Sequence, residues 1–296
     1  IPSIAGVLMC ILDVVFNFFL IFPSREFSAG GLTLSIPGAG LGVQGAALGT
    51  GLAESVAAAI TLWYLFTRSS GLKIKAWRKS PSLPAPPIIR NSIRISLPMG
   101  LEHAVICGAQ IMTTVIVAPL GIPAIAANSF AITAESLCYM PGYGIADAAT
   151  TLVGQSLGAG RHRLTRRFAY ITVFMGMAVM GIMGVVMYIF APQIIGTMTP
   201  VEEIRRLGVM ALRIEAFAEP MFAAAIISYG VFVGAANTLV PSLMNFFSIW
   251  AVRISLAAWL APTMGLKGVW VAMCAELCFR GIIFLIRLRG KRWMKI

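Results

Sequence analysis

The stretch that decides the fold is residues 169–190, AYITVFMGMAVMGIMGVVMYIF, which contains no charged side chain. A helix of about 20 apolar residues is long enough to cross the hydrocarbon core of a bilayer. Just before this stretch stand four arginines, Arg161, Arg163, Arg166 and Arg167. A charged cluster followed by an uncharged run of this length predicts a transmembrane helix that starts at a membrane surface.

The same pattern recurs along the whole chain. Of its 296 residues, 58% are hydrophobic and 11% are charged, whereas a soluble domain carries about 25% charged residues. Reading outward for further apolar runs predicts about eight membrane crossings, so we expect an all-α fold, a polytopic membrane helix bundle. The fourth run is too long for one straight crossing, and Pro141 within it predicts a kink with an extension beyond the membrane. The predicted segments are residues 1–22, 42–66, 95–118, 124–157, 169–190, 212–234, 239–261 and 266–286.

The charged residues between the segments indicate which side of the membrane each loop faces. The chain has 23 lysines and arginines against 11 acidic residues. These basic residues alternate with apolar runs, so we expect the lipid bilayer, and not nucleic acid, as the partner. By the positive-inside rule, loops rich in lysine and arginine face the cytoplasm, which predicts a multi-pass protein of the cell (inner) membrane with a cytoplasmic C-terminus. The basic clusters lie within residues 68–94, 161–167 and 287–295, and the opposite loops hold only Arg25, Arg205, Arg206 and Lys267.

A basic, proline-rich stretch divides the predicted helices into two groups. Four cations lie within residues 73–79, and Pro81, Pro84, Pro86 and Pro87 follow. This composition predicts a semi-extended cytoplasmic linker over residues 67–94. We therefore expect residues 1–66 to be the last two helices of one lobe and residues 95–296 to be a six-helix lobe. Because the first segment enters from the cytoplasm, an even number of crossings, zero included, is expected before it.

The acidic residues are the most informative feature for function. An ionisable group near the bilayer centre costs about 3 kcal/mol on insertion scales, so such groups face a polar interior, pair with a partner or stay protonated. For any one of them, the alternative is an interhelical hydrogen bond that holds helices together. Eight acids lie in or at the ends of apolar segments, namely Asp13, Glu54, Glu102, Glu135, Asp147, Glu215, Glu219 and Glu276.

Five polar residues within the helices are candidates for binding a coupling cation or a substrate. Glu102, Glu135 and Glu219 lie in the third, fourth and sixth segments. Judged by depth, Glu102 belongs to the cytoplasmic half and Glu219 to the outer half, so the two cannot share one ion site in a static bundle. Asp13 and Asn17 lie one turn apart in the first segment, either beside a cation or as a packing contact. The sequence leaves open whether the cation is H⁺ or Na⁺.

A second group of charges predicts a structural ion pair. Arg253 in the seventh segment and Glu276 in the eighth lie at similar depths from the turn that joins these segments. Arg280 follows Glu276 by one turn on the same helix face. Pairing lowers the cost of burial but does not by itself make a functional site.

The sequence favours neither an enzyme nor a resident metal or cofactor. The five cysteines lie in apolar stretches without the spacing of metal ligands, so we expect buried, reduced thiols. A membrane-embedded enzyme could use Glu102 with His103, but the only other histidine, His162, lies in a predicted cytoplasmic loop. His103 is therefore a helix-packing residue or a proton relay, and we assign no catalytic residue.

Several motifs resemble those of the multidrug and toxic compound extrusion (MATE) family. Residues 144–160, GIADAATTLVGQSLGAG, resemble the family's eighth helix and the loop after it. Residues 12–22, LDVVFNFFLIF, are similar to the fifth-helix pattern L-N-x-x-x-N-x-x-L-I-F, with Asp13 where many relatives have Asn. The resemblance extends over nearly the whole chain.

Three shorter motifs add to this resemblance. Residues 234–238, GAANT, resemble the family pattern G-A-G-D-T but depart from it at Ala236 and Asn237. Leu97-Pro98 opens the third segment as in the family's seventh helix, and residues 265–270, GLKGVW, fit the start of its last helix.

The resemblance implies twelve helices in two six-helix lobes, of which this chain would hold helices five to twelve. It also implies a secondary antiporter for multidrug efflux, which exports small organic, often cationic, compounds in exchange for H⁺ or Na⁺ without a further cofactor. Relatives have coupling acids in helices one, seven or ten, and Glu102 and Glu219 each lie about one turn from the places expected in helices seven and ten. We expect a monomer. The alternative is a flippase for lipid-linked precursors with a related two-lobe architecture, which would need a basic cavity.

Overall fold

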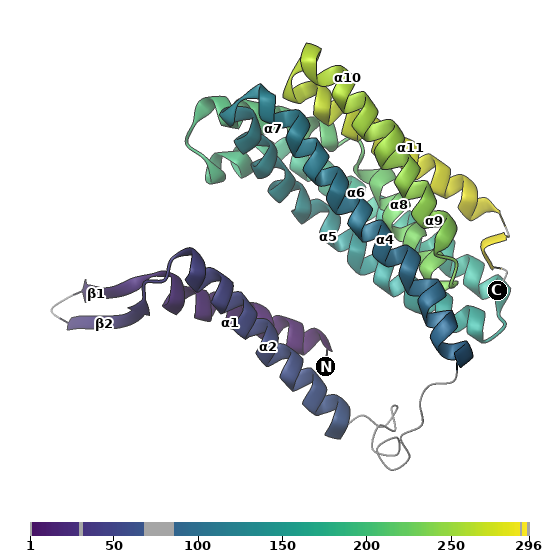
Figure 1. Cartoon of the computed structure of the whole chain (residues 1–296), viewed down its shortest axis with the longest axis horizontal. Helices are drawn as coiled ribbons and strands as arrows, with labels where there is room; N and C mark the ends of the chain where they lie inside the picture. The colour runs from purple at the N-terminus through teal and green to yellow at the C-terminus, as the bar shows by residue number, and fades with distance from the viewer. Residues whose placement is uncertain (1, 30–31, 68–85, 291, 295–296) are drawn as a thin grey trace. The chain divides into compact units, whose positions relative to one another are not determined.

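The structure, a computed structural model, describes residues 2–29, 32–67, 86–290 and 292–294. The chain divides into two compact units, residues 1–84 and 85–296 (Figure 1). Residues 68–85, which make up most of the predicted linker, lie outside the described residues.

The first unit consists of two long helices joined by a β-hairpin. Helix α1 (Pro2–Ile21) is followed by strands β1 (Pro23–Ala29) and β2 (Leu32–Ala39), which pair antiparallel, and then by helix α2 (Val43–Thr67). This hairpin lies between the first two predicted segments, residues 1–22 and 42–66, and was not predicted.

Helices α1 and α2 pack through a stripe of small residues on α2. The buried members of this stripe are spaced four apart, so they share one helix face and let the two backbones approach closely. A side chain on Gly45 would collide with the carbonyl oxygen of Leu20, which shows how close that approach is. The stripe consists of Gly45, Gly49, Ala53 and Ala57.

The second unit is a bundle of helices with three short irregular elements. Its helices are α4 (Pro86–Val117), α5 (Ile122–Gly158), α6 (His162–Met198), α7 (Glu202–Glu215), α8 (Glu219–Gly234), α9 (Leu239–Phe247), α10 (Ser255–Met264) and α11 (Leu266–Arg289). The 3₁₀ turn η1 (Ala118–Leu120) joins α4 to α5, the π-helix η2 (Ser248–Ile254) joins α9 to α10, and the 3₁₀ turn η3 (Arg292–Met294) follows α11.

Helix α4 begins at Pro86, ahead of the linker boundary that composition predicts at residue 94. Pro86 and Pro87 form its first turn, where a backbone N–H has no intrahelical acceptor, so prolines are tolerated there. The residues between Pro87 and Ile95 then continue the helix. The prolines that suggested an extended linker therefore also mark a helix start.

Helix α8 lies at the centre of the bundle and positions the site described below. It packs against α5, α6 and α11, and residues 223–228 are buried in an unbroken run. It approaches α5 closely where Gly230 faces the backbone of Ala146. There the Thr150 hydroxyl donates hydrogen bonds to the carbonyl oxygens of Ala146, at 2.9 Å, and Gly230, at 2.8 Å.

Two breaks occur where the sequence predicts continuous helices. The predicted sixth segment, residues 212–234, contains a 60° bend between α7 and α8, and Pro220 follows at the first turn of α8. The predicted seventh segment, residues 239–261, contains the π-helix η2. By contrast, α5 runs from Ile122 to Gly158 as one helix with Pro141 inside it.

The helical membrane fold predicted from the sequence is confirmed, with fewer clear crossings than predicted. Among the described residues, six helices are long and apolar enough to cross a membrane, and α7 with α8 makes a seventh if the bent pair is one span. Helix α5 is long enough but falls short in hydropathy, since it contains Asn128, Glu135 and Asp147. Large apolar side chains such as Ile182 and Trp259 are exposed, as expected of a surface that contacts lipid.

Candidate functional site

The second unit contains a cavity of about 500 Å³ lined by residues from five elements. This volume lies in the range of sites for drug-sized ligands. Polar and aromatic side chains line it, with acids on α4 and α5, aromatic rings on α5 and α8, an amide on α9 and a guanidinium on α11. These side chains are Glu102, His103, Tyr143, Asp147, Phe222, Tyr229, Asn245 and Arg280.

Glu102 is the buried acid of this cavity. Its side chain is only 7% exposed, and it accepts a hydrogen bond of 2.8 Å from the Ser242 hydroxyl and a second one from the Asn245 amide, both on α9. Within the described part of the chain, no basic side chain lies within ion-pair distance of Glu102. Its negative charge is therefore held by neutral donors and stays available to a bound cation.

His103 and Asp147 lie on the wall of the same cavity but are exposed side chains. His103 follows Glu102 directly on α4, and Asp147 lies on α5 within the stretch quoted for its family resemblance. The cavity thus holds one buried and one exposed carboxylate.

Glu135 and Glu219 are buried away from this cavity. Glu135 is 4% exposed and Glu219 is fully buried, and neither lines the cavity wall. The two carboxyl groups repel each other electrostatically, and Glu215 repels both. Neither oxygen of Glu215 or of Glu219 has a hydrogen-bond partner among the described residues. The structure therefore separates Glu102 from an acidic group at the break between α7 and α8.

Asp13 and Asn17 lie together on α1 in the first unit. The Asn17 amide donates a hydrogen bond of 3.2 Å to the Asp13 carboxylate. The other amide atom, Asn17 Oδ1, has no partner within the described residues, and it lies where a side chain on Gly49 of α2 would collide. The pair thus sits at the packed face between α1 and α2.

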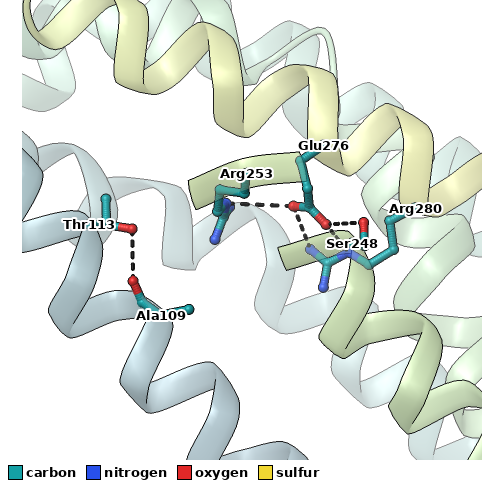
Figure 2. Close-up of polar contacts among 6 residues, drawn as sticks. All are labelled: Ala109, Thr113, Ser248, Arg253, Glu276 and Arg280. Carbon is teal, nitrogen blue, oxygen red and sulfur yellow. Dashed lines mark hydrogen bonds and ion pairs between the residues drawn. The ribbon is translucent and has the colours of Figure 1, made fainter. Parts of the chain in front are cut away.

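Glu276 has the opposite environment to Glu102. It is fully buried on α11, and its oxygens lie 3.5 Å from Arg253 Nε and 3.1 Å from Arg280 Nε. The Ser248 hydroxyl donates a further hydrogen bond of 2.6 Å to Glu276 (Figure 2). Two guanidinium groups and one hydroxyl therefore surround this one carboxylate.

Three hydrogen-bond donors of the site were not predicted from the sequence. Ser242 and Asn245 hold Glu102, and Ser248 holds Glu276. They are spaced three apart in the otherwise apolar stretch of residues 239–252, which places them along one side of the helix. That spacing is the sequence signal that could have singled them out.

Comparison with protein families matches residues 98–259 to the MatE family. Among curated relatives, the NorM protein of Thermotoga maritima, described as a probable multidrug resistance protein, is 27% identical over 262 residues, which cover 86% of this chain and 54% of the relative. The corresponding protein of Idiomarina loihiensis is 26% identical over 288 residues, covering 90% of this chain and 61% of that protein. The chain thus spans little more than half the length of these relatives.

Solved structures show the same fold. The crystal structure of a mutant of the Vibrio cholerae MATE transporter VcmN matches with a TM-score of 0.78 at 18% identity, over 98% of this chain and 62% of that chain. An outward-facing multidrug resistance transporter of the MATE family matches with a TM-score of 0.84 at 19% identity, over 97% and 61%.

Proposed function

Because this chain belongs to the MatE family, a family of membrane transporters and not of enzymes, we propose that it forms part of a secondary antiporter. The antiporter exports small organic, often cationic, drug-like compounds in exchange for H⁺ or Na⁺. The matched relatives are described as probable multidrug resistance proteins, which supports this proposal.

The single observation behind the proposal is the environment of Glu102. A carboxylate that neutral donors hold at the wall of a drug-sized cavity can be neutralised by a proton, by Na⁺ or by an organic cation. Only one of these can neutralise the same charge at a time, so each weakens the binding of the others. This competition is the physical basis of exchange.

Glu135 and Glu219 have a different role in this proposal. Among the described residues they form no ion pair on α5 or α8, and a charge buried without a close partner is costly. Because they lie off the cavity wall, we assign them to proton storage in the coupling path and not to drug binding. Asp13 and Asn17 are the candidates for binding a coupling cation or a substrate in the first unit.

We further propose a monomer. We also propose that the start of α6, with Arg163, and the C-terminus lie on the cytoplasmic side, because the basic clusters lie there. The flippase alternative is not favoured, since among the described residues lining the cavity Glu102 and Asp147 outnumber the one arginine, Arg280. A cavity of this charge suits a cationic solute better than a lipid phosphate.

The test is ion-driven efflux of a fluorescent organic cation from vesicles that contain the full-length protein. Glu102→Gln keeps the shape of the side chain but removes its charge, and we expect it to lower ion-driven efflux by at least about tenfold. Glu203→Gln, an exposed residue at the start of α7, is the matched control and should transport normally. Normal ion-driven efflux by Glu102→Gln would contradict the proposal.

A further inference from the structure

One membrane-spanning segment contacts two buried carboxylates that belong to two other helices. The segment runs from Leu239 to Met264 and contains α9, η2 and α10 in order. Its first part, α9, donates the Ser242 and Asn245 hydrogen bonds to Glu102 on α4. Its middle part, η2, supplies Ser248 and Arg253 to Glu276 on α11. The continuous backbone of this segment therefore connects the donors that hold Glu102 with the groups that hold Glu276.

The contacts with Glu276 depend on the π-helical backbone of η2. Ser248 and Arg253 are five residues apart, and an α-helix turns about 100° per residue, so it would place them about 140° apart. A π-helix closes its hydrogen bonds from residue i to residue i+5, which brings positions five apart onto one face. Figure 2 shows the result, with both side chains reaching the Glu276 carboxylate.

Glu276 is suited to anchoring this turn. It is fully buried, so losing a partner would leave part of its charge uncompensated in a low-dielectric interior. Arg280 lies on the same helix as Glu276 and cannot hold η2 in place. Among the described residues, the polar contacts that cross from η2 to Glu276 on α11 are those of Ser248 and Arg253.

We propose that Ser248 and Arg253 are positioning residues that act through η2 on the hydrogen bonds to Glu102. A π turn contains one residue more than an α turn. If η2 relaxed to an α-helix, α9 would rotate by about 100° relative to α10. Ser242 and Asn245 would then leave Glu102, although Glu102 and Glu276 make no contact with each other. The inference rests on the proposed function only in treating Glu102 as the coupling acid.

The test measures the state of Glu102 directly in the full-length protein. A membrane-permeant carbodiimide modifies accessible carboxyl groups, and mass spectrometry of the peptide that contains Glu102 gives the rate of labelling. Asn245→Ala removes a direct donor and serves as the positive reference. We expect Ser248→Ala, which does not touch Glu102, to raise the labelling rate in the same direction by about two- to tenfold, the factor that one hydrogen bond is worth.

The control variants separate positioning from general damage. Thr263→Ala removes an exposed hydroxyl of α10 whose hydrogen bond goes to Leu260 of the same helix, and it should label at the wild-type rate. Ser248→Thr restores a hydroxyl and should return labelling toward wild type. Glu276→Gln removes the anchor charge and should raise labelling at least as much as Ser248→Ala.

Two outcomes distinguish this inference from the proposed function. Wild-type labelling in folded Ser248→Ala protein, with increased labelling in Asn245→Ala, would overturn the positioning role while leaving the antiport proposal intact. Increased labelling in Ser248→Ala, with normal ion-driven efflux by Glu102→Gln, would keep the link and overturn the assignment of Glu102 as the coupling acid.

Discussion

At the scale of single residues, the character of a buried acid is set by the groups that hold it. Glu102 and Glu276 are both glutamates inside the bundle, but Glu102 is held by a hydroxyl and an amide, and Glu276 by two guanidinium groups and a hydroxyl. A neutral shell leaves a charge to be compensated, whereas arginines already compensate it. This difference separates the cation-binding role that we propose for Glu102 from the anchoring role that we propose for Glu276.

The backbone of Ala236 gives a prediction at the same scale. Ala236 has φ of 56°, a left-handed conformation that costs a residue with a Cβ about 1–2 kcal/mol. The resemblance to G-A-G-D-T places glycine at this position, and glycine adopts such a conformation at no steric cost. We expect Ala236→Gly to raise the free energy of unfolding by about 1 kcal/mol, measured as a higher melting temperature of the purified protein.

A second alanine-to-glycine substitution is the matched control and should change the free energy of unfolding in the opposite direction. Ala148 is exposed in the middle of α5, where alanine favours the helix and glycine does not, so Ala148→Gly should lower stability by about 1 kcal/mol. Equal destabilisation by both glycine substitutions would contradict the argument from the backbone of Ala236.

Sequence reasoning at this scale locates the acids but not their partners. Glu102 stands out because it interrupts an apolar run, and that much is visible without a structure. Its donors Ser242 and Asn245 follow 140 and 143 residues later on another helix, and their spacing does not tell which acid they contact. The chemistry of the site depends on packing that no local pattern encodes.

At the scale of elements, the bundle depends on close backbone contacts between α5 and α8. A methyl group on Gly230 would lie 2.6 Å from the carbonyl oxygen of Ala146, which is closer than van der Waals contact permits. Because the obstructing atom belongs to the backbone of another helix, the two helices would have to separate. Small residues are thus required on α8 at this contact.

Gly230→Ala therefore tests the packing of α5 on α8. We expect it to destabilise the protein by about 1–3 kcal/mol, the usual cost of overpacking, and to lower the melting temperature. Gly144→Ala is the matched control, because a methyl group there meets no atom within 4 Å and alanine is the better helix former. A melting temperature unchanged by Gly230→Ala would show that the close contact is not essential.

The elements that sequence patterns miss are the ones that interrupt long helices. Residues 32–36, LTLSI, alternate apolar and polar side chains as a strand does, but they stand in a short loop between two predicted crossings. The bend before Glu219 and the π-helix from Ser248 lie inside two predicted crossings, residues 212–234 and 239–261. Hydropathy reports where a segment lies and not how its backbone turns, so these breaks could not be predicted from it.

At the scale of the whole molecule, the apolar exposed surface and the alternating basic loops describe a multi-pass membrane protein. The proposed orientation places Arg163 on the cytoplasmic side and Arg206 on the opposite side. Both side chains are exposed in the structure, so either position accepts a label without disturbing the bundle.

Labelling from one side of the membrane tests this orientation. In a cysteine-free background of the full-length protein, we expect Arg206→Cys to react with a membrane-impermeant maleimide on intact cells. Arg163→Cys should react only after the cells are permeabilised, which also controls for the reactivity of each position. Labelling of Arg163→Cys on intact cells would require the inverted orientation.

The sequence predicts the family and the membrane bundle well, because long apolar runs and the motif of residues 144–160 are properties of the chain itself. It predicts the candidate site only in part, because the cavity is formed by residues of five elements that are far apart in the sequence. Only the three-dimensional packing shows that Glu102 and Asp147 line that cavity. It also shows that Glu135 and Glu219 do not.

The most direct measurement of the central claim is competitive binding to the purified full-length protein. The affinity for a fluorescent organic cation is measured at increasing concentrations of H⁺ and, separately, of Na⁺. If the organic cation and the coupling ion both neutralise Glu102, H⁺ or Na⁺ will weaken binding of the organic cation. The organic cation will weaken binding of that ion by the same factor. Glu102→Gln will abolish this mutual dependence. Independent binding of the organic cation and both ions in the wild-type protein would contradict the account.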